Sequence, residues 1–266
     1  MNKTLFKSNI KFNWGIFAFI SGMLLIYVTT SITMFDPDGA EAMMAMFEML
    51  PEGMIKAFGF DGLGADLTSY LASYLYGFIL LVFPMIYTIM VANKLVAKHV
   101  DSGSMAYLLA TPNSRVEIIL TQAIYLVTST FVLIVFEISV LIIMAESLFP
   151  GLLRIKEFIS LNLVTFLVII VVGGISFLCS CIFNETKNSI AFGAGIPIIF
   201  FVLKMVSEIS EKVEFLKYFS VYSIVNPEKI MNDGSYTTMV CLILVGVAVI
   251  LYGSAIYIFN KKSLAI

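Results

Sequence analysis

The polar segment Lys98–Glu117, which reads KHVDSGSMAYLLATPNSRVE, holds the side chains whose types and spacing could do most chemistry. Asp101 and Ser104 can each cap the start of a helix. Pro112 ends that helix near Ala110, because proline disfavours helical geometry in the residue before it. A helix of about two turns is too short to be stable alone. The segment therefore predicts a short helix that other parts of the protein must hold in place.

The predicted short helix has one apolar face. Met105, Leu108 and Leu109 stand at i, i+3 and i+4, so they project from the same side. They could fill a groove on a partner protein, each contributing up to ~1.5–3 kcal/mol if fully buried. They could equally tuck against the ends of membrane helices or against lipid headgroups. Gly103 favours the first interpretation, because a glycine before a short helix suits the close approach of another backbone.

Other reactive side chains are few. The single histidine, His99, excludes a metal site built from two or three histidines. The three cysteines, Cys179, Cys181 and Cys241, lie inside apolar runs and indicate small core residues rather than disulfides. No nucleophile elbow, paired-carboxylate cluster or phosphate-binding glycine loop occurs. We therefore expect neither a catalytic residue nor a metal site, and any ATP that drives this protein must bind to another chain.

The composition is that of a membrane protein. Of the 266 residues, 60% are hydrophobic and 13% are charged, and the mean hydropathy is +0.99. A soluble domain carries about a quarter charged residues, so most of this protein's surface must face lipid. The net charge is −2 and the basic residues form no dense block, which excludes nucleic acid as a partner.

Six stretches are long and apolar enough, or nearly so, for the roughly 20 helical residues that cross a bilayer core. They lie at about residues 13–35, 67–93, 116–145, 158–184, 188–207 and 234–260. The third begins at a capping box formed by Ser114 and Glu117. The fifth reaches Ser207 only if the Lys204 side chain snorkels to the membrane surface. We expect an all-α polytopic membrane protein in which residues 1–266 form one domain.

The charge distribution predicts that both termini lie in the cytoplasm. Six spans place the termini on one side, and that side then carries nine Lys and Arg residues against seven on the other. The nine are Lys3, Lys7, Lys11, Lys94, Lys98, Arg115, Lys187, Lys261 and Lys262. The first three recur every four residues, which suits contact with lipid headgroups.

Positions in the segment between the second and third spans form an ordered pattern: an acid, any residue, Gly, Ser, then a Leu-Leu pair, a Pro and Ser-Arg. They are Asp101, Gly103, Ser104, Leu108, Leu109, Pro112, Ser114 and Arg115. In this pattern the chain resembles the type-2 permeases of ATP-binding-cassette exporters. The Phe83-Pro84 pair of the second span is similar to the family too, whereas Gln122 stands where a Lys is common.

The resemblance implies a six-span permease subunit of an ATP-driven exporter in a bacterial cell membrane. It implies a second permease subunit, identical or homologous, and a cytosolic ATP-binding-cassette ATPase subunit that binds ATP and Mg²⁺. The residues that would couple the chain to this ATPase are Asp101, Gly103, Ser104, Met105, Leu108, Leu109, Pro112 and Arg115. The alternatives are an ion-coupled secondary transporter and a membrane anchor that transports nothing. The sequence does not identify the cargo.

Three residues within the spans are candidates for the transport path or its gate. Pro84 and Pro197 lack backbone donors and should kink the second and fifth helices. Gly193 and Gly195 could break the fifth span, although we favour close helix packing through small residues. Glu137 is the only acid in the interior of a span. A rise of ~1.5 Å per residue places it about 30 Å along the third helix, so we expect an interfacial carboxylate rather than a buried proton relay.

Overall fold

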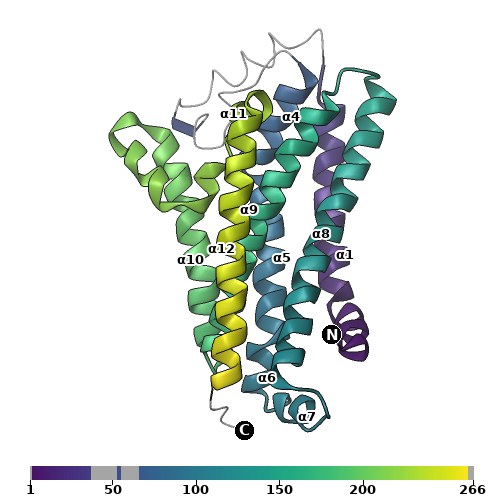
Figure 1. Ribbon diagram of the computed structural model, residues 1–266. Helices are drawn as coiled ribbons and strands as arrows, with labels where there is room; N and C mark the ends of the chain where they lie inside the picture. The colour runs from purple at the N-terminus through teal and green to yellow at the C-terminus, as the bar shows by residue number, and fades with distance from the viewer. Residues whose placement is uncertain (1, 37–52, 55–65, 263–266) are drawn as a thin grey trace.

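The computed structural model describes residues 2–36, 53–54 and 66–262. Within these ranges the chain is helical and contains no strand, and six of the helices are long and apolar enough to cross a membrane. The helices stand side by side as one bundle (Figure 1). The predicted fold class, an all-α polytopic membrane protein, is confirmed.

The predicted spans match the helices closely at most of their ends. The helices are α1 (Lys3–Thr33), α4 (Leu67–Tyr76), α5 (Ile79–Leu95), α6 (Ala97–Asp101), α7 (Met105–Leu109), α8 (Arg115–Leu148), α9 (Ile155–Ile182), α10 (Thr186–Ile209), α11 (Pro227–Asn232) and α12 (Gly234–Lys261). Two 3₁₀ helices, η2 (Glu211–Phe219) and η3 (Val221–Ile224), follow α10. The first predicted span is part of a longer helix, because α1 already begins at Lys3.

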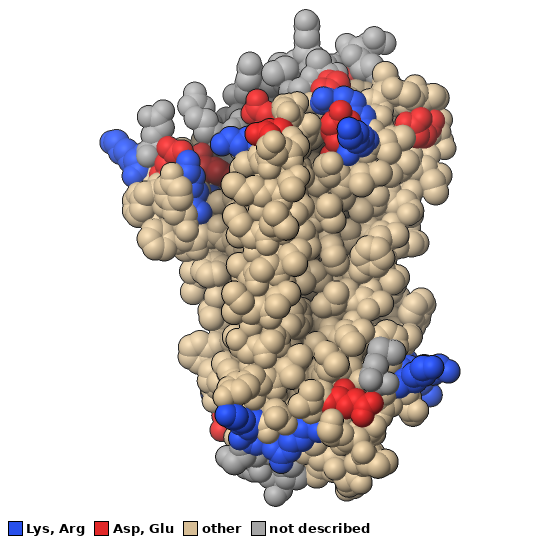
Figure 2. Space-filling view, in the orientation of Figure 1, with Lys and Arg blue, Asp and Glu red and all other residues tan. Residues whose placement is uncertain are grey.

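The two ends of the bundle differ in what they hold. The start of α1, the end of α12 and the short helices α6 and α7 lie at the lower end in Figure 1, and α4, η2 and α11 lie at the upper end. Charged side chains gather at both ends, and an uncharged band separates them on the face drawn in Figure 2. This is the arrangement that a bilayer around the middle of the bundle requires.

Helix α9 lies at the centre of the bundle and is the span with the largest buried share. Glycines let its neighbours approach closely. A Cβ atom on Gly174 would lie 3.2 Å from the Cβ of Leu251 in α12. A Cβ on Gly193 of α10 would lie 3.3 Å from the Cα of Ser176 in α9. The packing interpretation of Gly193 is therefore confirmed, and α10 runs unbroken through this region.

Pro197 does not break α10, because another group replaces the donor that it lacks. Proline has no N–H, so the Gly193 carbonyl four residues earlier loses its helical hydrogen bond. The Ser176 hydroxyl of α9 donates to that carbonyl at 2.6 Å. Helix α10 therefore runs unbroken past Pro197, since a neighbouring helix satisfies the free carbonyl.

The second predicted span, residues 67–93, is interrupted at Gly77 and Phe78, between α4 and α5. The prediction of one continuous helix, kinked at Pro84, missed this break. The ammonium of Lys204 in α10 donates to the Gly77 carbonyl at 3.3 Å and also pairs with Glu208. Lys204 is only 3% exposed, so it does not snorkel as predicted. It lies inside the bundle because the broken helix offers a free carbonyl there.

Polar side chains join α1 to α8 in the lower half of the bundle. The Asn9 amide donates to the Gln122 side-chain oxygen at 2.5 Å, and both residues are buried. The Asn2 backbone N–H donates to the Thr121 hydroxyl at 2.9 Å. Gln122, where the chain departs from the family pattern that it resembles, therefore serves contact between two helices.

Candidate functional site

The segment that the sequence singled out forms two helices of five residues each at the lower end, α6 and α7, rather than one helix of two turns. Gly103 separates them. Its φ of +71° lies in the left-handed region that favours glycine, and a Cβ atom there would meet nothing within 4 Å. Gly103 is therefore explained by the turn it makes, and the close approach of a partner backbone stays a prediction.

The predicted caps of the short helix act elsewhere. Ser104 stands at the N-cap position of α7 without a capping hydrogen bond, and its hydroxyl lies 2.8 Å from Nδ1 of His99. The Asp101 carboxylate accepts from the backbone N–H of Thr186, the first residue of α10, at 3.3 Å. Asp101 thus serves the N-terminus of a membrane span, where a negative charge is favourable.

The apolar face of α7 turns into the bundle. Met105 is fully buried, and Leu108 and Leu109 are half-buried against the core. Tyr107 is 81% exposed. Sequence reasoning missed Tyr107 as a surface residue, although the helical period places it opposite the face formed by the other three. Of the two interpretations of that face, tucking against the membrane helices describes this structure.

The turn after α7 leads directly into the third span. Helix α7 ends at Leu109, as Pro112 predicts. Ser114 is the N-cap of α8, and its hydroxyl accepts from the Glu117 N–H at 3.1 Å, which confirms the predicted cap. The next residue, Arg115, donates to the backbone carbonyl of Lys262 at 2.8 Å.

Lys262 extends this connection to α9. Its ammonium donates to the carbonyls of Cys181 and Phe183 at 3.0 Å and 2.9 Å, at the C-terminus of α9, where a cation is favourable. Burial lowers the pKa of the Lys262 ammonium. These hydrogen bonds join the start of α8 to the ends of α9 and α12 at the lower end of the bundle.

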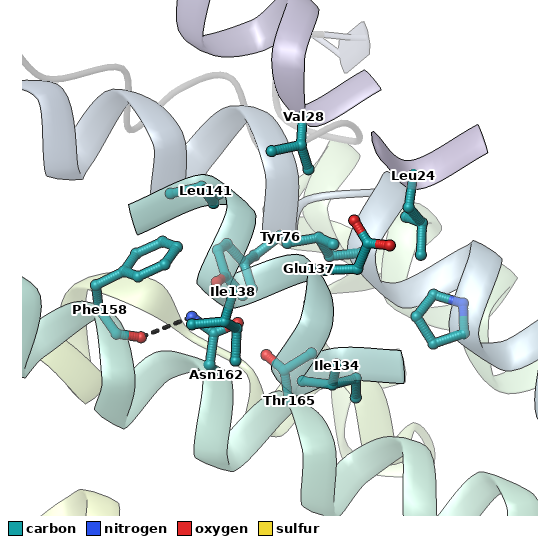
Figure 3. A pocket seen from close by; sticks show the side chains of 12 residues that line it. Leu24, Val28, Tyr76, Ile134, Glu137, Ile138, Leu141, Phe158, Asn162 and Thr165 are labelled. Atoms are coloured by element: carbon teal, nitrogen blue, oxygen red, sulfur yellow. Dashed lines mark hydrogen bonds between the residues drawn. The ribbon is translucent and has the colours of Figure 1, made fainter. Parts of the chain in front are cut away.

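Glu137 and Pro84 lie together, far from this segment, around a small cavity between α1, α5, α8 and α9 (Figure 3). Glu137 is 3% exposed, so the expectation of an interfacial carboxylate is wrong. The helical rise gave its depth, but neighbouring helices enclose the position on all sides. Pro197 is not among the residues that line this cavity. Within the described ranges, no group of three His, Cys, Asp or Glu residues could hold a metal ion.

The fold and the connected helix ends at the lower end define a polytopic α-helical membrane protein, with six spans among the residues that the structure describes. The sequence profile described as "ABC-2 family transporter protein" matches residues 14–264. The chain therefore belongs to the ABC-2 family of transporter proteins, and the resemblance drawn from the segment Lys98–Glu117 is confirmed. No curated protein matches the chain significantly.

Proposed function

We propose that this chain is the membrane permease subunit of an ATP-driven exporter. A separate ATP-binding-cassette ATPase, which holds ATP and Mg²⁺, binds the lower end, and this end with both termini lies in the cytoplasm. Two six-helix subunits, identical or homologous, form the translocation path between them. Family membership supports the transport role, and the charge distribution supports the orientation.

The observation that carries this proposal is the way α6 and α7 are connected to the spans. One residue, Val96, joins α6 to α5. Asp101 holds the start of α10, and the turn at Ser114 leads into α8. A displacement of these two short helices therefore acts on three spans at once. An ATPase that must move several membrane helices needs a binding site that is connected to all of them, and α6 and α7 are connected in this way.

Tyr107 is the side chain that we expect the ATPase to bind. It is large, amphipathic and 81% exposed, and tyrosines are enriched among the residues that dominate binding energies. Met105, Leu108 and Leu109 hold α7 in place by packing into the bundle. Docking thus uses the outer face of α7, while its inner face passes the movement to the spans.

The test is co-purification of the tagged chain in mild detergent, followed by mass measurement of the intact complex. We expect two permease chains with two ATPase chains. Tyr107→Asp should weaken ATPase binding by about tenfold or more. Tyr218→Asp is the matched control, because Tyr218 is 80% exposed at the upper end. Equal binding by both variants would contradict docking at α7.

An ion-coupled secondary transporter is the second candidate, and one observation favours it: the buried Glu137 inside the bundle. The two candidates separate in reconstituted vesicles. Cargo export that requires the ATPase and ATP supports the first candidate, and export driven by an ion gradient without any ATPase supports the second.

A further inference from the structure

The cavity beside Glu137 has the size of a single small ligand. Its volume is ≈ 20 Å³, and a water molecule needs about 10–15 Å³ by the same measure. It is enclosed by α1, α5, α8 and α9, with Tyr76 from the end of α4 (Figure 3). Apart from Glu137, Asn162, Thr165 and the Tyr76 hydroxyl, the side chains that line it are apolar.

Nothing in the cavity balances a negative charge on Glu137. Among the residues that the structure describes, neither of its carboxyl oxygens has a hydrogen-bond partner. No Lys, Arg or His lines the cavity from any of the packed helices, and Tyr76 is its one other titratable group. An ionised carboxylate that is buried without a partner costs several kcal/mol or more. A proton on the carboxyl group removes this cost.

Two other groups beside the cavity lack a usual hydrogen-bond partner. Pro84 has no N–H, so the carbonyl of Leu80, four residues earlier, lacks its usual helical donor, and both residues line the cavity. The Thr165 hydroxyl, which lines the same space, has no partner within the described part of the chain. A carboxylic acid adds one donor to this space.

We propose that this cavity is a proton-binding site, in which Glu137 carries a proton while the bundle is packed in this state. If α8 separates from α1 and α5, water reaches the acid. The O–H bond then breaks, the proton leaves on a water molecule as hydronium, and a hydrated carboxylate remains. Proton binding needs only this chain, whereas release during a transport cycle rests on the proposed function.

Infrared spectroscopy of the purified full-length chain in lipid, at neutral pH and without an ATPase, tests the site directly. We expect the C=O stretching band of an un-ionised carboxylic acid in the native protein and its loss in Glu137→Gln. Glu146→Gln is the control on the same helix, because Glu146 lies outside the cavity and accepts from the Gly151 N–H at 3.1 Å. That variant should keep the band.

A native spectrum without the band, or a band that Glu137→Gln leaves unchanged, would overturn the proposal. Glu137→Met is a second variant, of similar length and without polar atoms. It should lose the band as well, and its melting temperature should equal or exceed that of Glu146→Gln, because no ion pair of Glu137 is lost. A clearly lower melting temperature would show that the carboxyl group is ionised and paired, against the proposal. Neither measurement involves transport, so failure of the exporter proposal would leave both results standing.

Discussion

Helices α5 and α10 share a buried hydrogen bond, from the Asn93 amide to the Ser189 hydroxyl at 2.9 Å, and a further contact at each end of the bundle. At the lower end, Asp101, which follows α5 through α6, accepts from the Thr186 N–H at 3.3 Å, and this contact is exposed. At the upper end, the ammonium of Lys204 donates to the Gly77 carbonyl just before α5, also at 3.3 Å. The Lys204 side chain is 4% exposed and pairs with Glu208 at 3.2 Å.

The difference in burial indicates which end opens more easily. Charge interactions strengthen as the local dielectric falls, and water screens those at the surface. The upper contact is therefore the stronger of the two, and the lower contact is the one that a partner could release. In the proposed exporter, α5 and α10 would separate at the lower end, beside α6 and α7, where the buried Asn93–Ser189 hydrogen bond must also break, and would pivot about Lys204.

The largest effect is expected at the upper contact. Lys204→Met should destabilise the protein by about 2–3 kcal/mol, because the Gly77 carbonyl loses its donor and Glu208 loses its cation. The measurement is thermal unfolding of the purified chain in detergent. The exposed Lys212→Met is the control and should change stability by less than about 0.5 kcal/mol. Equal losses of stability in the two variants would contradict the interpretation of Lys204 as the pivot between α5 and α10.

The hydrogen bond from Ser176 of α9 to the Gly193 carbonyl of α10 should give a smaller effect when it is lost. Ser176→Ala should cost about 1–2 kcal/mol, because it leaves the Gly193 carbonyl without a donor. Pro197→Ala restores the N–H that Gly193 needs, so Ser176→Ala should cost less in that background. A double-mutant cycle by thermal unfolding measures this coupling. A cost that is the same in both backgrounds would refute the account of Pro197.

Sequence patterns predicted the spans well and their interior poorly. The apolar stretches, the Ser114 cap and the stop at Pro112 depend on local rules of hydropathy and helix termination, which the chain carries in short windows. The order of residues from Asp101 to Arg115 sufficed for the family. These features need no knowledge of neighbouring helices.

The features that were missed depend on contacts between segments far apart in the sequence. The break at Gly77 is supported by Lys204, which lies 127 residues later. Glu137 has the right depth for an interfacial acid, yet the surrounding helices enclose it. The sequence did not decide whether the apolar face of α7 points into the bundle or toward a partner, because a short apolar face does not show what covers it. Of that helix, only Tyr107 could have been placed outward from the helical period alone.

Loss of the lower contact, between Asp101 and Thr186, should reduce stability only slightly and should reduce ATPase activity more. Asp101→Ala removes the acceptor for the Thr186 N–H and should cost about 0.5–1 kcal/mol. Asp101→Asn keeps an acceptor oxygen and should cost less. In the purified complex, we expect Asp101→Ala to reduce cargo-stimulated ATPase activity more than Asp101→Asn does. Full activity of the alanine variant would show that α6 does not act on α10.

The smallest effect is expected for the exposed ion pair of Arg154 and Asp66 at the upper end. This pair tests whether the Lys204 contact is strong because it is buried or because of its position. Arg154 lies 3.2 Å from Asp66, the same separation as Lys204 and Glu208, but both side chains are over 40% exposed. Asp66→Asn keeps the cap on Ser69 and removes the charge, so it should cost only about 0.2–1 kcal/mol. A loss as large as that of Lys204→Met would mean that burial is not the cause.

The pH dependence of this pair has a definite sign. Partial burial raises the pKa of Asp66, but hydrogen bonds from Ser69 and the charge of Arg154 outweigh it, so the pKa lies below the usual 3.8. A carboxyl group with a lowered folded-state pKa stabilises the protein above its unfolded pKa and loses that contribution as the pH falls through the folded value. The difference in melting temperature between the native protein and Asp66→Asn should therefore be constant near neutral pH and shrink below about pH 4. A difference that persists unchanged at lower pH would show that the charge of Asp66 contributes nothing, and that Arg154 holds α4 through its backbone N–H on Thr68 alone.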